Sequence, residues 1–239
     1  MNKLTTKISV IIPCYNEKNT ILEILKRVKL QKENYNLEVI VSDDGSRDGT
    51  LDLLENSKEF YDLLLLSDKN RGKGAAIKRG IEKASGEIIL IQDADLEYNP
   101  NDYENLIKPF LENDADVVFG SRFMGSSAHR LIYYSHRIAN FIITNLVNLF
   151  TNINFSDVET GYKVFKKSLL RDIKLVENSF GIEIEITMKF AKIKAKIFEV
   201  GISYNGRSYS EGKKITIKDA FIAIYLTFKY FLLNLKKVN

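Results

Sequence analysis

An unbroken aliphatic run from Ile88 to Ile91 leads almost directly into two carboxylates, Asp93 and Asp95. Four consecutive aliphatic residues predict a strand that is buried on both faces, as in a parallel sheet covered by helices. Open α/β sheets bind ligands at the carboxyl ends of such strands, and two carboxylates placed there repel each other. A divalent cation is therefore their natural partner. The same three-residue pattern also occurs in turns and helix caps, so a plain turn is the alternative.

Apolar runs alternate regularly with helical patterns through the first half of the chain, an order typical of parallel βαβ units. Right-handed crossovers would place helices on both faces of a mostly parallel sheet, so the predicted fold class is α/β. We predict strands near residues 7–12, 37–42, 62–66, 87–92 and 115–120, and helices near residues 20–30, 49–56, 74–84 and 102–112.

The sequence after Arg122 is richer in aromatic residues and contains two long apolar stretches, at about 127–150 and 217–235. Neither has the roughly 20 uninterrupted apolar residues that a membrane-spanning helix needs. Two interpretations stay open. The stretches are core or dimer helices, which would allow a homo-oligomer, or amphipathic helices that lie in a membrane interface.

Composition narrows the class of protein. The chain has 239 residues, 45% of them hydrophobic, which suits one α/β domain with a sizeable core. Its net charge of +4 is spread without a basic block, so we expect no nucleic acid partner. The single cysteine, Cys14, excludes an internal disulfide, and no apolar leader follows Met1. We therefore expect a cytoplasmic protein.

Polar residues also follow the first two predicted strands. Pro-Cys-Tyr-Asn-Glu occupies positions 13–17, and Asp-Asp-Gly-Ser occupies positions 43–46. Because the carboxyl ends of parallel strands meet at one edge of a sheet, we expect both segments to lie near Asp93 and Asp95. Asp-Gly-Ser is also good turn chemistry, so a turn or helix cap is the alternative role of Asp43 and Asp44. At least one of these two carboxylates is surplus to that role.

The segment Asn-Arg-Gly-Lys-Gly at positions 70–74 opens the third predicted helix. Its two glycines permit close approach of the backbone, and its lysine and helix amino terminus favour a diphosphate. A glycine turn with a solvated lysine is the alternative. The segment lacks the spacing of a Walker A loop, and the chain contains no Gly-x-Gly-x-x-Gly dinucleotide fingerprint.

In this order, the four motifs closely resemble the inverting family 2 glycosyltransferases of the GT-A fold, and more narrowly the polyprenyl-phosphate or dolichyl-phosphate mannose and glucose synthases. The resemblance continues through residues 120–122, 159–163 and 180–183. It implies a Rossmann-like GT-A domain over residues 1–212, with a nucleotide-sugar-binding half at about 1–122 and an acceptor half at about 123–212. A C-terminal amphipathic helix would occupy residues 213–239.

The resemblance also implies roles on the donor side. Asp95 would bind Mg²⁺ or Mn²⁺ with the help of Glu97 and Asp93, and Asp93 would also orient the sugar or a metal-bound water. Glu97 is a departure, since many mannose synthases have Gln at this position. The residues implied at the nucleotide sugar are Pro13, Tyr15, Asn16, Glu17, Asp43, Asp44, Lys73, Gly74, Asp93, Ala94 and Asp95.

On the acceptor side, the resemblance places Arg122 near an acceptor phosphate. Arg130, Arg137 and Arg207 are further candidates. The polar loop 207–214 would be a flap that closes on a phosphate through Arg207 and Lys213, with an ordinary solvated loop as the alternative. The residues expected to act in catalysis are Asp93, Asp95, Arg122, Arg207, Lys213 and Glu183.

The need for a general base depends on the acceptor. A monophosphate is largely ionised at neutral pH and needs no strong base, whereas a hydroxyl does. Glu183, Glu185, Glu159 and His136 are the candidates for that base. Glu183 and Glu185 also suit the first turn of a helix, where acids are favoured.

We therefore expect a metal-dependent enzyme that moves a hexose, with inversion, from UDP-glucose or GDP-mannose to a polyprenyl phosphate. Transfer to a hydroxyl of a glycan, lipid or protein is the first alternative, and a non-catalytic membrane-associated scaffold is the second. Many relatives add transmembrane helices after this domain, whereas this sequence ends at Asn239. We therefore expect peripheral attachment to the cytoplasmic face of a membrane.

Overall fold

A seven-stranded mixed sheet forms the centre of the computed structural model, which describes residues 5–125, 130–131 and 133–235. Its order is β3-β2-β1-β4-β6-β5-β7. The strand β6 runs antiparallel to both β4 and β5, and the pairs β1 with β2, β1 with β4, β2 with β3 and β5 with β7 are parallel. The strands are β1 (Ile8–Cys14), β2 (Leu37–Asp43), β3 (Leu63–Leu66), β4 (Ile88–Ile91), β5 (Val117–Ser121), β6 (Lys163–Lys166) and β7 (Ile197–Gly201).

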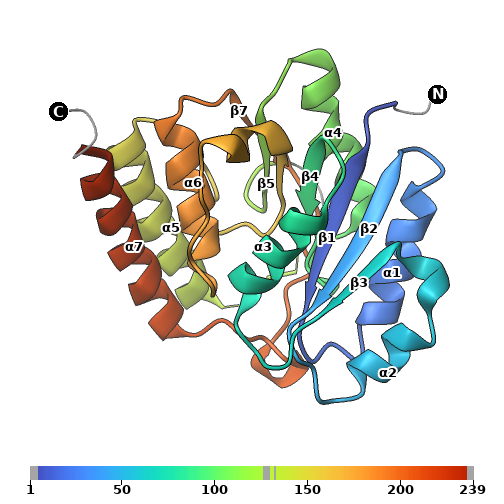
Figure 1. The fold of residues 1–239 in the computed structure, drawn as a ribbon. Coiled ribbons are helices and arrows are strands. Elements are labelled where there is room, and N and C mark those ends of the chain that lie inside the picture. Colours follow the sequence, from blue (N-terminus) through green and yellow to red (C-terminus); the bar gives the residue numbers. More distant parts are fainter. Residues whose placement is uncertain (1–4, 126–129, 132, 236–239) are drawn as a thin grey trace.

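Helices cover both faces of the sheet, which gives the molecule three layers (Figure 1). One face packs against α1 (Ile21–Gln31), α2 (Thr50–Glu55) and α4 (Tyr103–Glu112). The other packs against α3 (Lys73–Lys83), α5 (Tyr134–Thr151), α6 (Ile182–Lys192) and α7 (Ile217–Leu235). Short 3₁₀ helices lie in the connections: η1 (Lys58–Phe60), η2 (Pro100–Asp102), η3 (Lys167–Arg171) and η4 (Tyr209–Glu211).

The predicted α/β class is confirmed, and so are the five strands and four helices predicted in the first half of the chain. Their ends differ from the predicted ones by at most two residues. The aliphatic strands explain this success. In β1, Ile8, Val10 and Ile12 face the layer of α1, while Ile11 faces the layer of α3, and all four are fully buried. A strand that is apolar on both faces is easily read from the sequence.

The second half differs from the prediction. The helix predicted at 127–150 begins at Tyr134, because the backbone of Tyr133 is extended, and residues 127–129 and 132 lie outside the described residues. Neither β6 nor β7 was predicted. The sequence of β6, Lys-Val-Phe-Lys, does not look like a buried strand because it begins with a lysine. In the structure this lysine, Lys163, is fully buried. Burial of a lysine requires partners that a local pattern does not show.

The last helix, α7, is part of the core of the domain. It packs beside α5 and α6, and it buries Ala223, Leu226 and Tyr230 in the same cluster as the α3 side of the sheet (Figure 1). Its outer side is apolar and exposed. Among the described residues, no helix combines the length and apolarity that crossing a membrane requires.

Glu38 joins three chain segments at the amino-terminal edge of the sheet. Its carboxylate accepts hydrogen bonds from Lys7 Nζ at 3.1 Å and Ser9 Oγ at 2.5 Å. It also accepts bonds from the backbone nitrogen and the hydroxyl of Ser85, at 2.8 and 2.6 Å. Burial alone would raise the pKa of Glu38, but these hydrogen bonds outweigh burial and lower it to about 2.

We expect Glu38 to make stability depend on pH. Because its pKa is lower in the folded state, its contribution is complete above its ordinary value of 4.5 and is lost as the pH falls from there towards 2. Between about pH 6 and 3, the free energy of unfolding of the native chain should fall by about 2 kcal/mol more than that of Glu38→Gln. Urea denaturation measures this difference. The exposed Glu23→Gln serves as control, and equal pH slopes for the native chain and Glu38→Gln would contradict the expectation.

Candidate functional site

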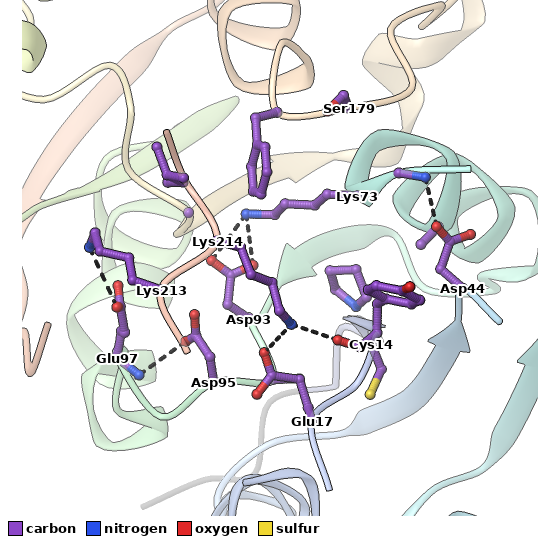
Figure 2. A pocket seen from close by; sticks show the side chains of 18 of the residues that line it. Cys14, Glu17, Asp44, Lys73, Asp93, Asp95, Glu97, Ser179, Lys213 and Lys214 are labelled. Atoms are coloured by element: carbon purple, nitrogen blue, oxygen red, sulfur yellow. Dashed lines mark hydrogen bonds and ion pairs between the residues drawn. The ribbon is translucent and has the colours of Figure 1, made fainter. Parts of the chain in front are cut away.

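A cavity of about 340 Å³ lies at the carboxyl ends of β1, β2 and β4. Loops from the second half of the chain complete its wall (Figure 2). Most residues predicted for the site line this cavity: Pro13, Tyr15, Glu17, Asp44, Lys73, Asp93, Ala94, Asp95, Glu97, Arg122, Glu183, Arg207 and Lys213. Five predicted residues lie elsewhere: Asn16, Asp43, Gly74, Arg130 and Arg137.

Asp93 heads a chain of alternating buried charges. Lys73 Nζ lies 2.7 Å from Asp93 Oδ1 (Figure 2). The same Nζ lies 2.9 Å from Glu183 Oε1, and Lys163 Nζ lies 2.9 Å from Glu183 Oε2. Burial would lower the pKa of Lys73, but the two acids beside it raise that pKa well above its ordinary value. Burial would likewise raise the pKa of Glu183, but the two lysines lower it. Glu183 is therefore an ionised partner in this chain rather than a general base.

Asp95 meets a different cation, Arg207, which follows β7. Arg207 Nη2 lies 2.9 Å from Asp95 Oδ2, and Arg207 Nη1 lies 3.1 Å from Glu17 Oε2. Residues 205–216, which we call the strap, also bring two lysines to these acids. Lys213 Nζ lies 3.6 Å from Glu97 Oε1, and Lys214 Nζ lies 2.6 Å from Glu17 Oε1 (Figure 2).

Asp95 is buried among other acids. Burial, followed by the charges of Asp93 and Glu97, raises the pKa of Asp95 to about 7, although Arg207 opposes this rise. Asp95 and Glu97 offer the hard oxygen ligands that Mg²⁺ and Mn²⁺ prefer. Within the described ranges, however, no three acidic, histidine or cysteine side chains converge as a metal cage. The predicted trio with Asp93 therefore does not form one in this arrangement, since Asp93 pairs with Lys73.

The two acids at the end of β2, Asp43 and Asp44, have different roles: the first stabilises a turn and the second lines the cavity. Asp43 Oδ2 accepts the backbone nitrogens of Gly45 and Ser46, both at 3.0 Å, which is the turn role considered as the alternative. Asp44 Oδ2 accepts the backbone nitrogens of Arg71 and Gly72, at 2.7 and 2.6 Å, and so fixes the loop before α3. Asp44 lines the cavity, and its buried Oδ1 lies 3.6 Å from Arg79 Nη2, beyond hydrogen-bond distance.

The start of α3 is not the open anion site that the glycine-rich segment predicted. The backbone nitrogens of Arg71 and Gly72 donate hydrogen bonds to Asp44, and that of Ala75 donates to the carbonyl of Asn178 at 3.0 Å. These three donors are therefore already used within the protein. A side chain at Gly74 would collide with the backbone of residues 177–179. Gly74 is therefore needed for the packing of α3 against this loop rather than for a phosphate.

Asn16 is also a structural residue. Its φ of 51° puts it in the left-handed region, where Asn is one of the tolerated residues. Its backbone nitrogen donates to Ser46 Oγ at 2.9 Å, and its Oδ1 accepts the nitrogen of Arg47 at 2.8 Å. Asn16 thus joins the loops after β1 and β2 behind the cavity wall.

Arg122 lines the cavity, and its guanidinium is held by a buried carboxylate. Its Nε and Nη2 donate to the two carboxylate oxygens of the fully buried Asp157, both at 2.7 Å. Its guanidinium also lies over the rings of Tyr204 and Phe123. This bidentate pair fixes the plane of the guanidinium, which is how Arg presents a defined surface to an anion.

Arg130 and Arg137 lie outside the cavity wall. Arg130 Nη1 donates to both carboxylate oxygens of Glu211, at 3.0 and 2.8 Å, and thereby ties its own segment to the strap. The guanidinium of Arg137 lies 5.6 Å from the centre of the Phe123 ring. His136, a candidate base, lies in hydrogen-bond contact with the hydroxyl of Tyr209 at 2.9 Å. Another candidate base, Glu185, accepts backbone nitrogens of residues 176–177 and is fully buried.

Several important residues were not singled out from the sequence. Asp157 and Lys163 are buried ionic partners of predicted residues, and no local pattern announces such partners. Tyr98 lines the cavity, and its hydroxyl accepts the backbone nitrogen of Gly161 at 3.0 Å. A side chain at Gly161 would collide with the carboxylate of Asp93. The glycine within the motif Glu-Thr-Gly-Tyr-Lys was the available signal for this close approach.

We expect Glu183→Gln to destabilise the fold strongly. It removes the negative charge between Lys73 and Lys163, and leaves a fully buried lysine without an ionised partner. The free energy of unfolding should fall by about 3 kcal/mol. Chemical denaturation measures this loss. The exposed pair of Lys108 and Glu112 provides the control, because Glu112→Gln should cost less than about 1 kcal/mol. A loss of the same size in both variants would show that the buried chain contributes no more than a surface pair.

A family model described as glycosyl transferase family 2 matches residues 9–174. The dolichol-phosphate mannosyltransferase of Pyrococcus furiosus is 29% identical over 214 residues, which are 87% of this chain and 60% of that protein's length. A dolichyl-phosphate beta-glucosyltransferase of Trichomonas vaginalis is 27% identical over 88% of this chain and 68% of its own length.

A solved structure shows the same fold. The glucosyl-3-phosphoglycerate synthase of Mycobacterium tuberculosis, in complex with Mn²⁺, uridine diphosphate and glucosyl-3-phosphoglycerate, superimposes with a TM-score of 0.74 at 18% identity. The match covers 96% of this chain and 80% of that one. With a family model that spans most of its residues, the chain belongs to glycosyl transferase family 2, a family of sugar-transferring enzymes, and it has the GT-A fold.

Proposed function

We propose that this protein transfers a hexose from a nucleotide diphosphate sugar to a polyprenyl phosphate. The observation that carries the proposal is the meeting of strand-end acids with the cations of the strap in one cavity. Carboxylates can hold a metal ion, and arginine and lysine can hold phosphate, which are the two needs of a metal-bound nucleotide diphosphate. The names of two relatives, a dolichol-phosphate mannosyltransferase and a dolichyl-phosphate beta-glucosyltransferase, support a lipid phosphate as the acceptor.

Asp95 would hold Mg²⁺ or Mn²⁺, with Glu97 as a second oxygen ligand. The bound ion would neutralise negative charge that develops on the diphosphate leaving group. Burial raises the pKa of Asp95, the acids Asp93 and Glu97 add to that effect, and a cation at this place would oppose the rise. The mycobacterial synthase of the same fold, which was crystallised with Mn²⁺, agrees with this choice of metal.

The nucleotide would lie over the ends of β1 and β2. Pro13, Tyr15 and Asp44 line this part of the cavity, and the buried Oδ1 of Asp44 can accept a hydrogen bond from a base edge. Arg207 and Lys213 would then bind the diphosphate when it takes the place of the carboxylates that they contact here. Departure of the nucleotide diphosphate from one face of the sugar carbon, and attack on the other, would invert its configuration.

An ionised acceptor phosphate fits the acids of the site. Glu183 is fixed between Lys73 and Lys163 with a lowered pKa, so it is a poor proton acceptor. A phosphate acceptor does not need one, because it is already largely ionised at neutral pH. The guanidinium of Arg122, held in place by Asp157, would face that phosphate from the cavity wall. Arg130 and Arg137 would act farther out, at the approach to the site.

One observation favours the alternative of a hydroxyl acceptor. Burial raises the pKa of Glu159 to about 7, and Glu159 lines the cavity. A carboxyl group with such a pKa could take a proton from a hydroxyl. The two candidate functions differ in the product, so a transfer assay separates them.

An apolar surface on α5 and α7 supports a membrane partner. The two helices lie side by side at one end of the molecule (Figure 1). The surface is formed by their large exposed side chains. A contiguous exposed apolar surface marks a protein or membrane contact. Such a surface would place the cavity of this peripheral protein beside a lipid acceptor. Its residues are Tyr134, Ile138, Phe141, Ile142 and Leu149 on α5, and Ile217, Phe221, Ile222, Tyr225, Phe228, Leu232 and Leu233 on α7.

We expect metal-dependent transfer of radiolabelled hexose from UDP-glucose or GDP-mannose to a short polyprenyl phosphate, which gives an acid-labile lipid. Asp95→Asn should lower the rate by about 100-fold or more, because it removes a ligand that helps to neutralise the leaving group. Asp52→Asn, an exposed change on α2, should leave the rate unchanged. Absence of a lipid product with every donor would reject the proposal, and label on an added alcohol instead would favour the alternative.

We expect the full chain to float with vesicles that contain anionic lipid. Phe221→Ser, which removes a ring that is 68% exposed on α7, should weaken binding about tenfold. Leu30→Ser is the matched control, since Leu30 is 62% exposed on α1 in the opposite layer. Equal flotation of both variants would show that the α5 and α7 surface does not contact lipid.

A further inference from the structure

Glu159 occupies the inner wall of the cavity, in the loop between α5 and β6. It lines the cavity together with its neighbour Gly161, whose backbone packs directly against the carboxylate of Asp93. Arg122 lines the same wall. Glu159 therefore faces the part of the cavity beyond Asp93, away from the ends of β1 and β2.

The structure gives other acids of this region a partner, but it gives Glu159 none. Asp157 binds both its oxygens to Arg122, and Glu183 lies between two lysines. Glu199 accepts the backbone nitrogen of Ser156. In contrast, Glu159 Oε1 is buried and has no hydrogen-bond partner among the described residues. A buried acceptor without a donor is costly, so a ligand hydroxyl that donates to this carboxyl group would relieve that cost.

The position of the other groups indicates which part of the donor would meet Glu159. Tyr15 and Asp44 lie at the nucleotide end, and Asp95 with Arg207 lies where the diphosphate would be. The hexose of a nucleotide sugar follows the diphosphate, so it would extend along the inner wall. We propose that Glu159 binds hydroxyl groups of the hexose that is transferred. This inference rests on the proposed function.

Hexose hydroxyls suit this carboxylate chemically. Each oxygen of this carboxyl group can accept a hydrogen bond, so two neighbouring hydroxyl groups can each donate to one of them. A site that is built to bind a hydroxyl discriminates strongly against a sugar that lacks it, since the buried oxygen would again be unpaired. Glu159 would thus select the hexose, while the nucleotide end selects the base.

The test compares a nucleotide sugar with its nucleotide diphosphate alone. We measure the affinities of UDP-glucose and UDP, and of GDP-mannose and GDP, by calorimetry with Mn²⁺. Glu159→Ala should weaken the binding of the nucleotide sugar about tenfold to a hundredfold, and leave that of the nucleotide diphosphate within about twofold. Glu159→Gln keeps the shape of the side chain and one acceptor oxygen. Its affinity for the nucleotide sugar should therefore lie between those of the native chain and Glu159→Ala. The native chain should also bind a deoxyhexose donor more weakly than the parent sugar, and Glu159→Ala should abolish that difference.

Glu199→Gln is the matched control, because Glu199 supports the adjacent residues 156–157 without lining the cavity. It should leave the ratio of the two affinities unchanged. The inference is overturned if Glu159→Ala weakens nucleotide sugar and nucleotide diphosphate equally, or if it lowers only the rate of transfer to a hydroxyl and leaves binding intact. If the native chain binds no nucleotide sugar at all, the proposed function itself fails, which is a distinguishable result.

Discussion

The buried chain Asp93, Lys73, Glu183 and Lys163 is the interaction on which the site depends. Its two acids and two lysines alternate, so each charge that leaves water has an opposite charge within 3 Å. Charges buried in this way are tolerated only with close partners. The chain joins β4 and α3 of the first half to α6 and β6 of the second half. The inner wall of the cavity is therefore assembled only when both halves of the sequence have folded together.

On the outer side of the cavity, acids are also paired with cations, but these cations lie on a different kind of segment. Glu17 and Asp95 are held by Arg207 and Lys214, which belong to the strap rather than to a strand or a long helix. Such a set can exchange partners without a large change in net charge. In the proposed function the acids would exchange the strap for a metal ion, and the strap would exchange the acids for a diphosphate. Each group would thus exchange one charged partner for another of the same sign, which keeps the cost of the exchange low.

The sequence predicted the first half of this arrangement well because its information is local. Aliphatic runs such as Ile88 to Ile91 define the strands, and the residues that follow them fall at one edge of the sheet by topology alone. What each carboxylate binds was not predictable in this way. Asp43 and Asp44 are adjacent, yet one closes a turn and the other holds the loop before α3. Lys163 looks like a solvated lysine until Glu183, 20 positions away, supplies its partner.

The ion pairs that Lys73 and Lys163 form with acids also bear on the acceptor in the proposed function. A general base must be able to gain a proton near neutral pH, but Lys73 and Lys163 lower the pKa of Glu183, so protonation would break two ion pairs. Asp93 also forms an ion pair with Lys73, and protonation of Asp93 would break that pair. An acceptor that arrives already ionised avoids this conflict, and it would be attracted by Arg122, whose guanidinium Asp157 holds at the wall. In the proposed function this charge arrangement would favour a phosphate acceptor over a hydroxyl, and Glu159 would then be free to bind the sugar.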